Sequence, residues 1–106
     1  MPHYLMLTKL TEQGRRTVRD NPARIQEVNR EIEGMAANVK VTAQWFLLGP
    51  YDFATIIDAP DNWNMSKIAM ELGARGTVET LTMPALRTED FITFMQPPAA
   101  AKGRRS

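Results

Sequence analysis

The chain has 106 residues, a formal net charge of +1 at pH 7 and no cysteine. This length suits one compact domain with a single hydrophobic core. The small net charge provides no overall field that would attract nucleic acid or an acidic substrate. The lack of cysteine excludes disulfides, thiolate nucleophiles and metal sites built on cysteine.

The N-terminal ten residues lack the cationic lead, long apolar stretch and small-residue cleavage site of a signal peptide. No apolar run approaches the ~20 residues that a membrane-crossing helix needs. We therefore expect a cytoplasmic protein without a membrane or nucleic-acid partner.

The first predicted elements are a strand over residues 3–10 and a short helical turn that Thr11 can cap. Arg15, Arg16 and Arg19 follow the turn. We interpret them as a solvated cationic connector in preference to an anion-binding ledge, because nearby arginines are common on surfaces.

A helix should follow, with Asn21 as its N-cap and Pro22 in its first position. Apolar residues then recur at spacings of three and four and form one stripe: Ile25, Val28, Ile32, Met35 and Val39.

Residues 41–48 and 51–59 are predicted to be two strands of a hairpin with a type II′ turn at Gly49 and Pro50. This register pairs Leu48 with Tyr51, Phe46 with Phe53 and Gln44 with Thr55. One face then carries Thr42, Gln44, Phe46, Leu48, Tyr51, Phe53, Thr55 and Ile57. The other carries Val41, Ala43, Trp45, Leu47, Asp52, Ala54, Ile56 and Asp58.

Asp61 can cap a second helix, which Gly73 or Gly76 should end. A fourth strand is predicted over residues 77–86, and Pro84 indicates either an edge strand or the end of a strand. A last helical turn should begin near residue 88. The domain is thus predicted to span residues 1–96, with a disordered basic tail over 97–106.

The order strand, helix, strand, strand, helix, strand predicts an α+β, ferredoxin-like βαββαβ sandwich. Its four-stranded sheet should be antiparallel, with two helices on one face. Because both faces of the hairpin are apolar and the helices cover one, we expect a second copy to cover the other, as a dimeric α/β barrel. We take the face that carries Phe53 as the uncovered one. In the alternative, residues 91–95 fold over it.

The segment Leu48-Gly49-Pro50-Tyr51-Asp52, with the exit Ala59-Pro60-Asp61, resembles the GYD-domain family. The segment Leu10-Thr11-Glu12-Gln13-Gly14 and Thr80-Leu81 also resemble it. The resemblance implies a dimeric, ferredoxin-like α/β-barrel fold in a small bacterial or archaeal protein of a largely uncharacterised family.

Asp52 stands beside the turn within an apolar run. Its carboxylate can accept backbone N–H bonds and pin the hairpin, which we favour, or act as a partly buried general base. Tyr51 can donate a hydrogen bond into a cavity or pack at a contact between copies. His3 is the single histidine and cannot form a chelating metal site by itself. It could ligate haem axially or act as an acid–base group, but we favour an ordinary side chain at the start of a strand. We expect no metal and no cofactor.

Gln44, Thr55, Phe53, Tyr51 and Asp52 are the predicted ligand-binding residues, because aromatic walls with a few hydrogen-bonding groups are typical of small-molecule pockets. We therefore expect a homo-oligomeric module that binds a small molecule or regulates. One alternative is a small oxygenase that uses Asp52, Tyr51 or His3 as acid–base groups. A second is an assembly module without a ligand.

Overall fold

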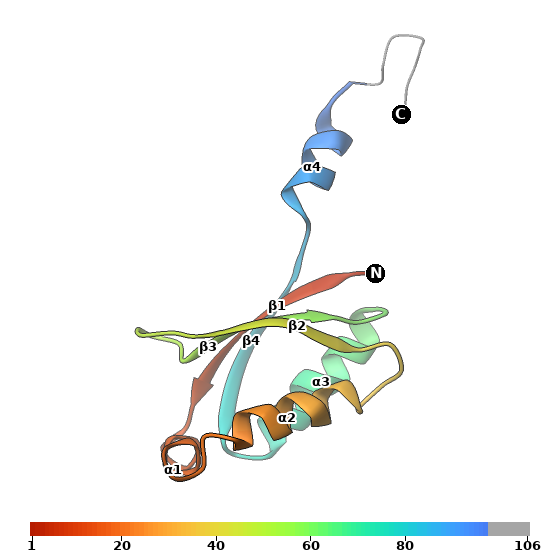
Figure 1. Ribbon diagram of the computed structural model, residues 1–106. Coiled ribbons are helices and arrows are strands. Elements are labelled where there is room, and N and C mark those ends of the chain that lie inside the picture. The colour runs from red at the N-terminus through yellow and green to blue at the C-terminus, as the bar shows by residue number, and fades with distance from the viewer. Residues whose placement is uncertain (98–106) are drawn as a thin grey trace.

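The computed structural model describes residues 1–97 and contains one four-stranded antiparallel sheet (Figure 1). The elements in chain order are β1 (His3–Leu10), α1 (Glu12–Asp20), α2 (Arg24–Glu33), β2 (Lys40–Phe46), β3 (Phe53–Asp58), α3 (Asn62–Ala74), β4 (Val78–Ala85) and α4 (Thr88–Met95). The strand order β2-β3-β1-β4 is that of the ferredoxin-like fold, so the predicted fold class is confirmed. Residues 98–106 of the predicted tail lie outside the described residues.

The core lies on the face of the sheet that α1, α2 and α3 cover (Figure 1). In β1, buried Tyr4 and Met6 alternate with partly exposed Leu5 and Leu7. The buried cluster is Tyr4, Met6, Ile32, Val39, Ile57, Ala59, Met65, Ile68 and Leu72. Burial of each large apolar side chain contributes about 1.5–3 kcal/mol, so this face holds the domain together.

The two helices before β2 differ from the prediction. Thr11 caps α1 as expected, but α1 runs for nine residues instead of one turn. Asn21 does not cap the next helix, because its backbone N–H bonds to the carbonyl of Thr17 and so closes α1. Its own carbonyl accepts from the N–H of Arg24, where α2 begins. Three helices, instead of the predicted two, therefore cover the sheet.

The hairpin keeps the predicted register but has a longer turn. The predicted pairs that fall within the strands are confirmed: Gln44 with Thr55 and Phe46 with Phe53. Leu48 and Tyr51 lie outside β2 and β3. Gly49 has a φ of 152°, far from the roughly +60° of a type II′ turn. The predicted two-residue turn is therefore wrong.

A β-bulge near the start of β2 changes one predicted face. Val41 pairs with Ile57 and Ala43 pairs with Ile56, which leaves Thr42 as the extra residue. Because this residue interrupts the alternation, Val41 packs against the core beneath the helices instead of lying on the opposite face.

β4 is an edge strand, as Pro84 predicts. After it, α4 extends away from the sheet (Figure 1). Phe91, Ile92, Phe94 and Met95 of α4 are all about half exposed or more. In this chain alone, residues 91–95 therefore do not cover the sheet, and that alternative is wrong.

Close backbone contact joins the start of α1 to the loop before β4. The N–H of Thr11 donates to the carbonyl of Thr77 at 3.0 Å, and its hydroxyl donates to the carbonyl of Gly76 at 2.8 Å. A Cβ atom at Gly14 would lie 2.0 Å from the carbonyl oxygen of Thr77. A side chain at Gly14 would thus separate two segments that the fold brings into contact.

Asp52 joins the hairpin to β1. Its backbone N–H donates to the carbonyl of Thr8 at 2.8 Å, and its carboxylate accepts from the backbone N–H of Leu10 at 2.7 Å. The favoured interpretation, that the carboxylate of Asp52 accepts a backbone N–H bond, is confirmed. The donor, however, lies on β1 and not in the turn. The carboxylate thus continues the pairing of β1 with β3 past its last pair, Thr8 with Phe53.

We predict that Gly14→Ala lowers the free energy of unfolding by about 1–3 kcal/mol or more, because the added methyl collides with backbone. Gly73→Ala is the matched control, since a Cβ there meets nothing within 4 Å. Because Gly73 lies in the last turn of α3, this control should be neutral or stabilise by at most roughly 0.5–1 kcal/mol. Denaturant midpoints measure both, and equal midpoints would contradict the close approach.

We also predict that Asp52→Ala costs about 1–3 kcal/mol, because it leaves the buried end of a strand with an unpaired N–H. Asp52→Asn keeps an acceptor oxygen and should recover most of the loss. Asp58→Ala should cost less, since its partner His3 lies 2.5 Å away in a pair that water reaches. Urea denaturation of the three variants tests the order, and an Asp58→Ala loss as large as that of Asp52→Ala would refute it.

Candidate functional site

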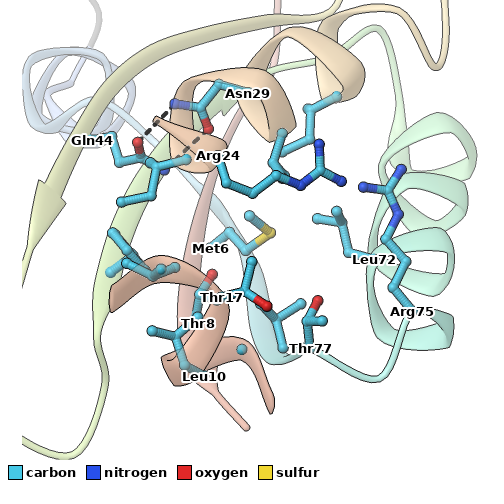
Figure 2. A pocket seen from close by; sticks show the side chains of 17 residues that line it. Met6, Thr8, Leu10, Thr17, Arg24, Asn29, Gln44, Leu72, Arg75 and Thr77 are labelled. Atoms are coloured by element: carbon cyan, nitrogen blue, oxygen red, sulfur yellow. Dashed lines mark hydrogen bonds between the residues drawn. The ribbon is translucent and has the colours of Figure 1, made fainter. Parts of the chain in front are cut away.

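A cavity of about 310 Å³ lies between the sheet and the helices α1, α2 and α3 (Figure 2). Most of its lining is apolar: Met6, Leu10, Val18, Ile25, Val28, Ile32, Phe53, Leu72 and Val78. We call it the helix-side cavity. Its volume falls at the small end of the range for small-molecule sites, which are mostly apolar with a few placed polar groups.

An amide pair forms one polar wall of the helix-side cavity. Asn29 of α2 donates to the side-chain oxygen of Gln44 at 2.8 Å, and Gln44 donates back at 3.2 Å (Figure 2). Gln44 also donates to the hydroxyl of Thr55 at 3.1 Å, and Thr55 is fully buried. These bonds fix the direction of both amides, so the wall presents a constant set of hydrogen-bonding groups.

Two arginines, one on α2 and one directly after α3, lie at the edge of the helix-side cavity and share one carboxylate. Arg24 of α2 donates to Glu31 at 2.9 Å and to Glu27 at 3.2 Å, and Arg75 donates to Glu31 at 2.5 Å. The hydrogen bonds from Arg24 and then Arg75 hold the pKa of Glu31 below its usual value. The bond to Glu31, then that to Glu27, raises the pKa of Arg24. Arg24 and Glu31 are therefore both charged near neutral pH.

The structure brings together three of the five predicted ligand-binding residues. Gln44 and Phe53 line the helix-side cavity, and the hydroxyl of Thr55 accepts a hydrogen bond from the Gln44 amide. Phe53 is 6% exposed and lies beneath the helices, so its assignment to the uncovered face is wrong. The register did predict that these three share a face, because paired residues of neighbouring strands lie side by side.

Tyr51 and Asp52 lie away from the helix-side cavity lining. Tyr51 lines a second, more open hollow with Lys9, Pro50 and residues 79–81. The carboxylate of Asp52 is bound to the backbone of Leu10. The predicted set therefore divides into a cavity group and a hairpin group.

Asn29, Arg24 and Arg75 are site residues that the sequence analysis missed. Arg24 lies off the apolar stripe of its helix, where a charged residue ordinarily faces solvent. Asn29 stands four residues after Ile25 and three before Ile32, so it lies on the apolar stripe of its helix, and that spacing was the available signal. Arg75 reaches the cavity through the ion pair with Glu31, which no spacing in the sequence indicates.

His3 has a hydrogen-bond partner on β3: its Nδ1 lies 2.5 Å from a carboxylate oxygen of Asp58. This pair lies at the opposite end of β1 from the Leu10–Asp52 bond. Within residues 1–97, no three His, Cys, Asp or Glu side chains gather as a metal site requires. No helix in that range is long and apolar enough to cross a membrane.

The second candidate feature is the sheet face that the described helices leave open. The strand register places two rows of side chains across it: Trp45, Ala54, Leu7 and Leu81, and Ala43, Ile56, Leu5 and Met83. Trp45 is 57% exposed and Leu81 is 47% exposed. This surface, the open sheet face, is apolar across all four strands.

The comparisons with known proteins agree with this architecture. The chain is 40% identical over 96 residues to the glutamine synthetase and cystathionine beta-lyase binding protein of Thermus thermophilus, a match over 91% of this chain and 100% of that protein. Among solved structures, MtbAldR superposes with a TM-score of 0.60 and 18% identity, over 81% of this chain and 52% of that one. The present chain thus spans about half the length of MtbAldR.

Two further structures have the same fold. FFRP-DM1 gives a TM-score of 0.54 at 16% identity, over 81% of this chain and 100% of that one. A second protein of Thermus thermophilus gives 0.52 at 19% identity, over 82% and 95% of the two chains. The sequence model of the GYD domain matches residues 4–95. With this match over nearly the whole described chain, the protein belongs to the GYD-domain family.

Proposed function

We propose that this chain is a small binding and regulatory module that works as a homo-oligomer and holds a small molecule in the helix-side cavity. The observation that carries the proposal is the cavity itself. Its side-chain polar groups are threonine hydroxyls, two amides and two ion-paired guanidiniums. Such groups hydrogen-bond and orient a molecule but are poor proton acceptors near neutral pH, which favours binding over catalysis.

The open sheet face supports self-association. Leu5, Leu7, Trp45 and Ile56 lie on it, and burial of each large side chain is worth about 1.5–3 kcal/mol. Their sum is comparable with the total stability of a small domain, about 5–15 kcal/mol. A second copy is the simplest cover, because two such faces are complementary by symmetry.

The proposal also includes a protein partner. The Thermus relative, 40% identical along its whole length, is named for binding glutamine synthetase and cystathionine beta-lyase. We propose that the present chain also acts by binding an enzyme of one of these classes, and that occupancy of the helix-side cavity changes this binding.

The oxygenase alternative receives less support from the geometry. Its acid–base candidates are His3, Asp52 and Tyr51. His3 and Asp52 lie at opposite ends of β1, and Tyr51 lines the second hollow. An assembly module without a ligand would have the same open sheet face. A test for a ligand in the helix-side cavity distinguishes it from the proposed binding module.

Native mass spectrometry of freshly purified protein tests the binding proposal. We predict a retained small molecule, seen as added mass per chain that disappears when the protein is denatured. Protein that carries no added mass after gentle purification, and that binds none of a set of small neutral compounds, would favour the assembly module.

Sedimentation equilibrium tests self-association. We predict that the wild type is a dimer at micromolar concentration and that Leu7→Glu, at the centre of the open sheet face, dissociates it by burying an unpaired charge at the contact. The monomer should remain folded, because Leu7 faces away from the core.

Met70→Glu is the matched control for this test, since Met70 lies 74% exposed on α3. It should leave the dimer intact. Phe53→Glu should unfold the protein instead, because Phe53 is buried beneath the helices and not on the uncovered face that the sequence analysis predicted. A monomeric wild type, or a Leu7→Glu variant that stays dimeric, would refute association through this face.

A further inference from the structure

The charges at the edge of the helix-side cavity are already balanced. Arg24 and Arg75 point toward one another there (Figure 2), and Glu31 accepts hydrogen bonds from both. Arg24 has a second carboxylate partner in Glu27. Two guanidiniums thus face two carboxylates, so an ionised ligand would have to displace an existing partner or enter without a counter-charge.

The unused hydrogen-bonding capacity inside the cavity is neutral. Both N–H groups of the Gln44 amide are committed, one to Asn29 and one to Thr55. An amide has two donors and two acceptor lone pairs. One N–H of Asn29 and one lone pair on each amide oxygen therefore remain unused by these bonds.

The size and lining of the cavity favour an apolar occupant over water. Native cores are close-packed, and voids larger than a water molecule are few. Apolar cavities do not hold ordered water, because a buried water needs two or more polar partners. Most of this lining is aliphatic, so water would be satisfied along the amide wall but not against Ile25, Val28 or Leu72.

We propose that the ligand of the helix-side cavity is an uncharged, mainly apolar molecule with one carbonyl, amide or hydroxyl group that hydrogen-bonds to Asn29 and Gln44. This inference rests on the proposed function, because it assigns the chemical class of the molecule that the cavity holds. Its apolar body lies between α2 and the sheet. Its polar group replaces water at the amide wall, while the ion pairs of Glu31 stay intact.

Two probes with the same alkyl chain test the class. Octanamide is neutral, and octanoate carries a charge at pH 7. In ¹H–¹⁵N NMR titrations, octanamide should shift the backbone amides of Gly14, Val28 and Phe53, which line the cavity on three different elements. Octanoate should bind at least about tenfold more weakly, because its carboxylate must lose water without gaining a free counter-charge.

Two variants locate the binding. Ile25→Trp fills the cavity from α2 and should abolish the octanamide shifts, whereas Met70→Trp, on the exposed face of α3, should leave them unchanged. Asn29→Leu removes one hydrogen-bond partner and should weaken octanamide by about three- to tenfold. If Ile25→Trp unfolds the chain, Asn29→Leu still tests the amide wall.

Each other outcome has a distinct meaning. Octanoate that binds as tightly as octanamide, with shifts at the cavity, would overturn the uncharged class and leave the binding site in place. Octanamide binding that survives Ile25→Trp in a folded protein, or is unchanged by Asn29→Leu, would overturn the assigned contacts. Absence of cavity shifts with both probes would overturn the inference and count against ligand binding itself.

Discussion

The contact between the backbone of Gly14 and the carbonyl of Thr77 is the constraint on which the rest of the structure depends. It holds the start of α1 against the loop between α3 and β4, and both residues line the helix-side cavity. The cavity is therefore closed at this end by backbone, which cannot change rotamer. Thr11 adds two hydrogen bonds to the same loop, so cap, glycine and loop form one rigid corner.

Leu10 connects this corner to the hairpin. Its N–H is bound by the carboxylate of Asp52, and its carbonyl accepts from the guanidinium of Arg15 at 2.9 Å. The two segments that resemble the family, around Gly14 and around Asp52, thus meet at the end of β1. Their residue types follow from geometry: a missing Cβ at one site and a short acceptor at the other. The residues that resemble the family are therefore explained by their structural roles, without any catalytic role.

Much of the fold could be predicted from the sequence, because alternation, caps and punctuation act locally. Thr11, Asp61 and Pro84 each have the predicted role. The bulge at Thr42 and the start of α2 could not be predicted, since tertiary packing decides them. The site was half predictable: Gln44 and Phe53 follow from strand register, and Asn29 shares the apolar stripe of its helix. Arg75 follows the end of α3 and reaches the site by its pairing with Glu31, which no single-sequence pattern indicates.

The carboxylate of Glu31 accepts hydrogen bonds from Arg24 of α2 and from Arg75 directly after α3, and these ion pairs are partly exposed to water. Attraction between exposed charges is screened by salt, with a Debye length of about 8 Å at physiological ionic strength. The buried apolar cluster beneath, which includes Ile32 and Ile68, carries no charge that salt can screen. Salt should therefore weaken the ion pairs of Glu31 at the edge of the cavity more than it weakens the hydrophobic packing beneath them.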